Sequence, residues 1–321
     1  MRVLITGGAG FIGSHLGDAH LAAGDVVMTL DNLTTGRHDN IRGHIGDPRF
    51  EFVLGSVLNA DLVDDLVSRA DVVYHLAAAV GVRLIVERPL ESLVTNIRGS
   101  EILLDKAHKY GKKVLITSTS EIYGKSPDVP MHEDSDRLLG SPLVGRWSYS
   151  TSKAVDEILA HAYWQAKGLP TVIVRLFNTV GPRQSAEFGM VLPRFIDAAL
   201  EGRDLKVHGD GSQSRCFGHV QDIVPALMAL MGSLEAEGLA VNLGSHEEIT
   251  IRALAELVIQ RTGSSSGIQF IPYKDVYVGG FEDMPRRVPD TTRARKLIGF
   301  DPRTTLVEIV DSMIEDARHR R

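Results

Sequence analysis

The chain has 321 residues, 43% of them hydrophobic and 24% charged, which allows two closely joined domains around a sizeable core. A formal net charge of -6 argues against nucleic acid or an anionic membrane as the main partner, and no apolar run approaches the roughly 20 residues of a membrane helix. A single cysteine, Cys216, and the lack of a signal-peptide pattern lead us to expect a cytoplasmic protein.

Short β-rich runs alternate with helical patterns in the first half of the chain. Regular alternation of strand and helix predicts an α/β fold, a doubly wound Rossmann sheet of parallel strands with helices on both faces. Such a sheet binds ligands at the carboxyl ends of its strands. The expected strands are residues 3–6, 26–31, 50–54, 72–76, 114–118 and 171–175, and the expected helices are residues 11–23, 60–69, 90–109 and 150–167.

After residue 175 the elements become shorter and turns more frequent, which predicts a smaller α/β substrate lobe. Residues 1–178 should form the dinucleotide-binding domain, with 219–244 rejoining it, while 179–218 and 245–321 should form the lobe. The expected helices are residues 191–201, 219–231, 251–261, 292–298 and 305–317, and the expected strands are residues 205–208 and 240–243.

Gly7, Gly10 and Gly13 lie between the first expected strand and the first expected helix. Gly7 permits a tight turn, Gly10 lets the backbone approach a pyrophosphate, and Gly13 lets the helix pack closely on the strand. The phosphates would meet free N–H groups at the helix N-terminus. A glycine-rich turn alone is a weak indication, but the flanking elements and Asp31 at the end of the second strand predict a dinucleotide site.

Asp31 also bears on the choice of cofactor. A carboxylate at this position can accept hydrogen bonds from both ribose hydroxyls but repels a 2′-phosphate, so we expect NAD rather than NADP. Arg37 follows a few residues later and is a cation that could hold a phosphate instead.

Tyr149 and Lys153 lie four residues apart on one face of an expected helix. A tyrosine with a pKa of about 10 is a poor base at neutral pH, but a nearby lysine cation and an oxidised nicotinamide would lower that pKa. Tyr149 could then take a hydroxyl proton while hydride leaves the same carbon, and Lys153 could hold the nicotinamide ribose. On an arbitrary surface helix this pair would mean little, but after five strands of a dinucleotide fold it is a catalytic candidate.

The glycine loop, Asp31, Leu76-Ala77-Ala78, Thr119 and the Tyr149/Lys153 pair together resemble the extended short-chain dehydrogenase/reductase family over nearly the whole chain. Members of that family are mostly nucleotide-sugar epimerases, dehydratases and decarboxylases. The resemblance implies that Thr119 assists Tyr149 and that Asn96 is a structural asparagine of the central sheet. The cofactor-binding residues that it implies are Gly7, Gly10, Phe11, Ile12, Gly13, Asp31, Asn32, Leu76, Ala77, Ala78, Asn96, Tyr149 and Lys153.

Thr119, Ser120 and Glu121 follow an expected strand and should lie beside the nicotinamide. A glutamate two residues after the hydroxyl that pairs with Tyr149 is better interpreted as an acid or base than as a solvated side chain. The sequence Thr-Ser-Glu resembles the UDP-glucuronate decarboxylases, including the UDP-xylose synthases, whereas the 4,6-dehydratases carry Asp where Ser120 stands. Residues 146–149, 211–215 and 287–290 also resemble decarboxylase segments.

The resemblance implies a decarboxylation in which C4 of UDP-glucuronate is oxidised with Tyr149 as base, so that the C6 carboxylate becomes β to a ketone. Loss of carbon dioxide leaves an enolate that Glu121, or a water that it orients, protonates at C5, and reduction of C4 would then give UDP-xylose. Arg215 and Arg287 would bind the diphosphate or carboxylate charge. The catalytic candidates are Thr119, Glu121, Tyr149, Lys153 and Arg287, the substrate-binding candidates are Asn178, Val191, Val207, Arg215 and Arg287, and no metal is expected.

Two other functions stay open. Residues 189–195 resemble the 4-epimerases of UDP-glucose or UDP-glucuronate, and residues 79–83 do not resemble the matching loop of the xylose synthases. A dinucleotide fold can also serve as a non-catalytic NAD sensor, although such proteins often lose the Tyr or the Lys that this chain keeps. Family members commonly form homodimers through the helices near residues 90–109 and 150–167, where the compatible apolar positions are Ile102, Leu103, Ile158 and Leu159.

Overall fold

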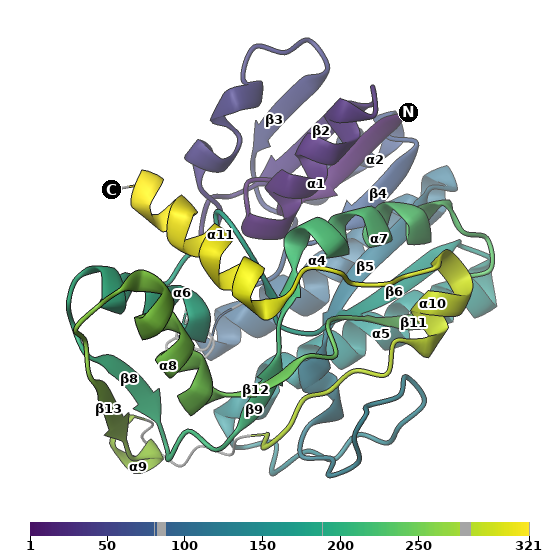
Figure 1. The fold of residues 1–321 in the computed structure, drawn as a ribbon. Helices are drawn as coiled ribbons and strands as arrows, with labels where there is room; N and C mark the ends of the chain where they lie inside the picture. Colours follow the sequence, from purple (N-terminus) through teal and green to yellow (C-terminus); the bar gives the residue numbers. More distant parts are fainter. Residues whose placement is uncertain (80, 82–87, 188, 277–283, 321) are drawn as a thin grey trace.

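The computed structural model describes residues 1–79, 81, 88–187, 189–276 and 284–320, and the structural statements below concern these residues. Within them, seven parallel strands form one sheet in the order β11-β6-β5-β4-β1-β2-β3 (Figure 1). The order reverses between β1 and β4, which is where doubly wound sheets bind their ligands. The strands are β1 (Arg2–Thr6), β2 (Val26–Asp31), β3 (Phe50–Leu54), β4 (Val72–His75), β5 (Lys113–Thr119), β6 (Thr171–Leu176) and β11 (Ala240–Leu243).

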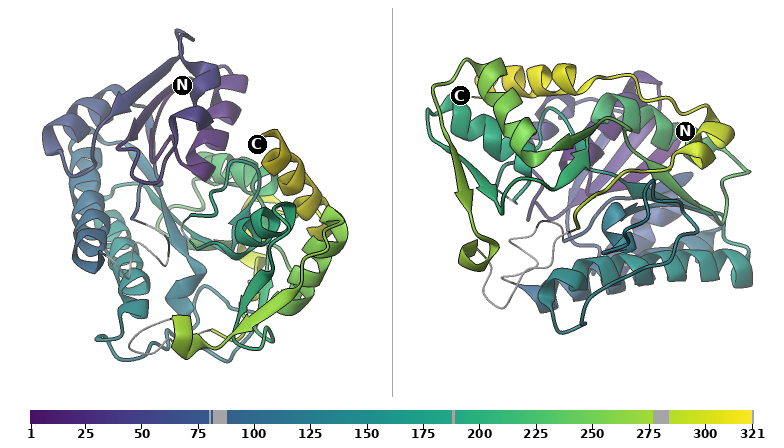
Figure 2. Two further views of the ribbon diagram at one scale, coloured as in Figure 1. Left: turned by 90° about the vertical axis from the view of Figure 1, so that its left-hand side faces the viewer. Right: turned by 60° about the horizontal axis from the view of Figure 1, so that its bottom comes forward.

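Helices cover both faces of this sheet, as the alternation of strand and helix predicts (Figures 1 and 2). Helices α4 and α5 lie side by side on one face with α2 beside α4, and α1 packs against α7 on the other face, where α10 also contacts α7 and β11. The helices of the first face are α2 (Ala60–Arg69), α4 (Pro89–Tyr110) and α5 (Ser148–Lys167), and those of the second are α1 (Phe11–Ala22), α7 (Val220–Gly232) and α10 (Thr292–Ile298).

Strand β1 shows why the sheet sits at the centre of the molecule. Its side chains alternate between the two faces, yet Val3, Leu4 and Ile5 are all fully buried because helices cover both faces. Leu4 packs in the cluster under the first set of helices, whereas Val3 and Ile5 pack in the cluster under the second. Burying each such side chain stabilises the fold by about 1.5–3 kcal/mol.

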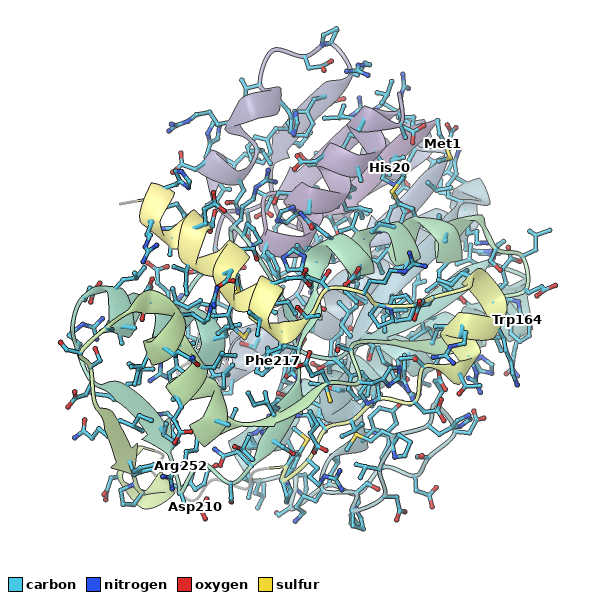
Figure 3. All side chains as sticks on the ribbon, in the orientation of Figure 1. Met1, His20, Trp164, Asp210, Phe217 and Arg252 are labelled. Carbon is cyan, nitrogen blue, oxygen red and sulfur yellow. The ribbon has the colours of Figure 1, made fainter. Side chains whose placement is uncertain are left out.

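The smaller lobe packs a few helices against a short pair of parallel strands. Helix α11 lies along α6 and α8, which themselves pack together, and it begins with a capping box made by Thr305 and Glu308 (Figure 2). Figure 3 places Asp210 and Arg252 close together at the free end of this lobe, where the Arg252 N–H donates to the Gly211 carbonyl at 3.0 Å. The elements are α6 (Val191–Leu200), β8 (Leu205–His208), α8 (Ile251–Thr262), β13 (Ile268–Ile271), α9 (Tyr273–Val276) and α11 (Leu306–His319).

Short bridges and turns join the lobe to the sheet. Two two-stranded pairs lie in these connections: β7 with β10 in parallel, and β9 with β12 antiparallel. Their bounds, with those of the short 3-10 helices, are β7 (Thr179–Val180), β9 (Ser214–Cys216), β10 (Gly218–His219), β12 (Glu248–Thr250), η1 (His38–Asn40), η2 (Arg42–His44), η3 (Ser120–Tyr123) and η4 (Gly145–Trp147).

The sequence patterns located these elements closely. The α/β fold with a parallel Rossmann sheet is confirmed, and β11 adds to the edge of that sheet as residues 240–243 were expected to do. Residues 292–298 are helical as expected, but α10 packs on β11 and α7 rather than within the smaller lobe. Among the described helices none is long and apolar enough to cross a membrane.

One buried ion pair ties helix α5 to strand β6. The Arg175 guanidinium donates to both carboxylate oxygens of Glu157, at 2.9 and 2.7 Å, and each side chain is 10% exposed. Arg175 also donates to the Tyr123 hydroxyl and the Glu133 carbonyl. Burial opposes the charge on Arg175, but the Glu157 carboxylate outweighs it and raises the pKa of the guanidinium.

We expect Glu157→Gln to lower the free energy of unfolding by about 3 kcal/mol, because the variant leaves the Arg175 cation buried without its counterion. Chemical denaturation measures this loss. The double variant Glu157→Gln/Arg175→Met removes both charges and should recover part of it. A single variant as stable as the parent would show that the pair contributes nothing.

Candidate active site

A cavity of about 360 Å³ opens at the carboxyl ends of the strands around the reversal of strand order. It extends from the turn after β1 to the start of α5 and reaches the beginning of the smaller lobe. The structure therefore brings together most of the residues that the sequence indicated. The predicted residues that line it are Gly7, Gly10, Phe11, Ile12, Gly13, Asp31, Asn32, Leu76, Ala77, Ala78, Thr119, Glu121, Tyr149, Lys153, Asn178 and Arg287.

The glycine loop is so tight that Gly7 and Gly13 leave no room for a side chain. Gly7 has a φ of 74°, and a Cβ on Gly13 would lie 2.1 Å from the Gly7 carbonyl oxygen. Gly10 is the N-cap of α1 and makes no side-chain capping hydrogen bond, so the first N–H groups of the helix are open to a ligand. This cradle of bare backbone at a helix N-terminus fits a pyrophosphate.

Asp31 ends β2 at the far side of the same cavity. Its carboxylate accepts hydrogen bonds from the Ala9 N–H at 3.0 Å and the Leu33 N–H at 2.8 Å, which fix its position. Burial raises the pKa of Asp31. Arg37, the cation that could bind a 2′-phosphate instead, is exposed and also lines the cavity. Its backbone N–H donates to the Ala9 carbonyl at 2.9 Å.

Tyr149 and Lys153 occupy the first turns of α5 and both face the cavity. The Lys153 ammonium is 2.8 Å from a carboxylate oxygen of Asp156, one turn further along the helix. In the free protein the pKa of Tyr149 is raised, first by burial and then by the negative charges of Glu121 and Asp156. The sequence led us to expect a pKa lowered by Lys153 together with an oxidised nicotinamide; in the protein alone, burial and these two carboxylates act in the opposite direction.

Glu121 lies in η3, just after β5, between two arginines from distant parts of the chain. Arg146 approaches one carboxylate oxygen at 2.5 Å and Arg287 the other at 3.7 Å. Burial would raise the pKa of Glu121, but the two cations outweigh burial and lower that pKa. Glu121 is therefore a carboxylate in the free protein, and Arg287 faces the cavity beside it.

Arg146 and Asp156 are the functional candidates whose roles the sequence did not reveal. Arg146 lies 25 positions from Glu121, and no spacing rule relates the two residues. Asp156 did leave a signal, since it follows Lys153 by three positions on a helix and such pairs face each other.

Several predicted residues do not reach the cavity as expected. Asn96 lies on α4 rather than in the sheet, and its amide bonds to Ala79 and to the Ser152 hydroxyl, which braces the loop after β4 against α5. Val207 is fully buried in the core of the smaller lobe, and Val191 packs against the same core.

Arg215 is also displaced from the cavity wall. Its guanidinium donates to the carbonyls of Ser214 and Met284, although its charge is close enough to lower the pKa of Glu121 further.

Asn178 does line the cavity and donates to the Cys216 carbonyl at 3.0 Å. Cys216 is buried, and burial raises the pKa of its thiol to about 12, which makes it a poor nucleophile. Val80, Val82 and Arg83, whose loop the sequence set apart, lie outside the described residues.

Comparisons with known proteins find relatives of nearly the whole chain. A family profile described as GDP-mannose 4,6 dehydratase matches residues 4–313. The chain is 43% identical over 305 residues to a UDP-N-acetyl-alpha-D-glucosaminuronate decarboxylase of Bacillus cytotoxicus, covering 94% of this chain and 92% of that protein. It is 38% identical over 314 residues to UDP-glucuronic acid decarboxylase 1 of Danio rerio, covering 98% and 72%.

A solved structure is similar over the full length. The UDP-glucuronic acid 4-epimerase of Bacillus cereus, in complex with UDP-glucuronic acid and NAD, superposes with a TM-score of 0.90 at 28% identity. The match covers 100% of both chains.

We expect Arg146→Gln to raise the pKa of Glu121 above that of the parent, because burial then acts on the carboxyl with one cation fewer. Carbon-13 NMR of the glutamate carboxyls, with Glu121→Gln to assign the resonance, measures the change. In the parent, the stability that ionised Glu121 contributes is present above its unfolded pKa and is lost as the pH falls through its lowered folded pKa. In the variant this loss should begin at a higher pH; an unchanged titration would mean that Arg287 alone keeps Glu121 ionised.

Proposed function

The chain belongs to the GDP-mannose 4,6-dehydratase family, among the extended short-chain dehydrogenases/reductases, and we propose that it is an NAD-dependent UDP-glucuronate decarboxylase. The observation that carries this function is the Glu121 carboxylate, 15% exposed, held between Arg146 and Arg287 in the same cavity as Tyr149 and Lys153. Relatives named as decarboxylases are 34–43% identical to nearly the whole chain.

The residues of the cavity fit NAD. The bare cradle of Gly7, Gly10 and Gly13 would receive the pyrophosphate, and the Asp31 carboxylate would receive the adenosine ribose. NAD bound here would supply a hydride acceptor at C4 of the sugar and a donor for the return of that hydride.

Tyr149 would take the proton of the C4 hydroxyl, and Thr119, which lines the cavity at the end of β5, would assist it at the same hydroxyl. Lys153 would add positive charge that favours the phenolate, an effect that its pairing with Asp156 reduces. Removal of the proton and the hydride leaves a ketone at C4, so the C6 carboxylate becomes β to a carbonyl. The electrons of the breaking C5–C6 bond then have an acceptor, and carbon dioxide can leave.

Arg287 and Glu121 would act on the carboxylate end of the sugar. Arg287 faces the cavity and can bind the C6 carboxylate before it is lost. Ionised Glu121 has no proton of its own to give to the enolate, so the lowered pKa favours a water that Glu121 orients as the source of the C5 proton. Arg146 keeps Glu121 in that state.

A second substrate has a specific observation in its favour. The relative that is 43% identical acts, by its name, on a UDP-sugar acid with an N-acetyl group, and its length matches this chain closely. Decarboxylation of UDP-N-acetylglucosaminuronate would use the same C4 and C6 groups. The 4-epimerase alternative has support from solved structures, but at 28–29% identity.

We further propose a cytoplasmic homodimer that pairs helices α4 and α5 of two copies. Of the four positions expected there, Leu103 is buried in the core, Ile102 and Leu159 pack against it, and Ile158 is 64% exposed. Leu90 and Val94, one turn apart on α4, are also exposed. These apolar side chains support a covered face at the two helices.

The assay that tests the function supplies UDP-glucuronate or UDP-N-acetylglucosaminuronate with NAD and resolves the products by mass. We expect a product lighter by carbon dioxide from at least one substrate. An isomer of equal mass would establish a 4-epimerase instead. Binding of NAD with no turnover of either substrate would favour a non-catalytic sensor.

Tyr149→Phe should abolish turnover while NAD still binds, because the phenol contributes its proton acceptor and not the cofactor cradle. Turnover is followed by the mass assay and NAD binding by calorimetry. Unchanged turnover in this variant would exclude Tyr149 as the base.

Asp31→Ala should weaken NAD binding and improve NADP binding relative to NAD by roughly tenfold or more, since it removes the repulsion of a 2′-phosphate and leaves Arg37 nearby. The ratio of the two dissociation constants measures the change. Arg37→Ala in the same background is the control, and it should reverse the gain for NADP.

A further inference from the structure

Helix α5 contains a buried ion pair that the proposed reaction does not account for. The Lys153 ammonium donates to Asp156 Oδ2 at 2.8 Å, and the two side chains are 3% and 0% exposed. The second carboxylate oxygen of Asp156 is buried and has no hydrogen-bond partner among the described residues. A buried carboxylate with one unsatisfied oxygen costs stability, so the pair calls for a functional explanation.

The pair bears directly on Tyr149. In a Tyr–Lys base the lysine charge favours the phenolate, but a carboxylate 2.8 Å from that charge cancels most of its effect on a third group. Glu121 adds a second negative charge on the side of η3. Tyr149 therefore faces two carboxylates and one neutralised cation.

The other charged groups around this turn of α5 have ion-pair partners of their own or are neutral. Arg146 and Arg287 pair with Glu121, and Glu157 pairs with Arg175. From the side of β4 comes His75, which is buried and neutral at physiological pH, because burial and the charge of Lys153 lower its pKa to about 3. Asp156 is thus the counterion that neutralises Lys153.

We propose that Asp156 is a positioning residue that holds Lys153 and sets the pH at which Tyr149 gives up its proton. This inference rests on the proposed role of Tyr149 as the base. Burial and Glu121 already raise the pKa of the phenol, and Asp156 adds to them by its own charge and by offsetting that of Lys153, so that ionisation of Tyr149 depends more on the charge of an oxidised cofactor. The base would be active when the hydride acceptor is present and inactive otherwise.

The test is a titration of Tyr149 in the NAD-loaded protein. Ionised tyrosine absorbs in the near ultraviolet, and subtracting the same protein carrying Tyr149→Phe isolates one phenol among the seven tyrosines. In Asp156→Asn, which keeps the shape and removes the charge, the midpoint should fall by about one pH unit. The acidic limb of the kcat/KM profile should move the same way, and Asp156→Glu should stay near the parent.

The matched control is Glu157→Gln, which removes the neighbouring buried carboxylate of the same helix. It loses stability but leaves Lys153 and Asp156 paired, so the midpoint should not move. A midpoint in Asp156→Asn that equals or exceeds that of the parent would overturn the proposal, as would an equal shift in Glu157→Gln. Should the asparagine variant not fold, Asp156→Ser removes the same charge and carries the same expectation.

The titration needs no sugar substrate, which separates the two proposals. A lowered midpoint in a protein that does not decarboxylate UDP-sugar acids would uphold Asp156 and overturn the proposed function. An unchanged midpoint in an active decarboxylase would do the reverse.

Discussion

A side-chain carbon on Gly13 would lie 2.1 Å from the Gly7 carbonyl oxygen, so helix α1 can approach the end of β1 this closely only with glycine at that position. That contact sets the direction in which α1 leaves the sheet. The N-terminus of α1 follows the end of β1, which is one of the two strands between which the strand order reverses. The cavity forms there, and the ends of β4 and β5 and the start of α5 complete its wall.

Two carboxylates lie close to Tyr149, and each has a cation as its partner. Glu121 is held by arginines from η4 and from the C-terminal part of the chain, and Asp156 is held by Lys153. Charges in such a buried setting act strongly on each other because little water screens them. Both carboxylates raise the pKa of Tyr149, so the chemistry of one phenol depends on these five charged side chains.

The fold could be predicted from the sequence because its signals are local. Runs such as Val26–Asp31 are mostly apolar and almost continuously buried, since both faces of the sheet are covered, and each helix shows its own spacing of apolar residues. The glycine loop, Asp31 and the Tyr149/Lys153 pair were identified for the same reason. Arg146 was not singled out, and Asn96 and Val207 do not lie where they were expected, because their partners lie far along the chain and local spacing carries no such contact.

The interleaving of the two parts has a consequence for how the protein is made. The edge strand β11 and helix α10 return to the sheet after the chain has already built α6 and β8, and α11 then goes back to the smaller lobe. Neither part is a continuous segment, so the sheet is incomplete until α10 is made and the smaller lobe is incomplete until α11 is made. A chain cut before α10 would leave β11 without the helix that packs on it and the smaller lobe without α11, so one cut would damage both parts at once.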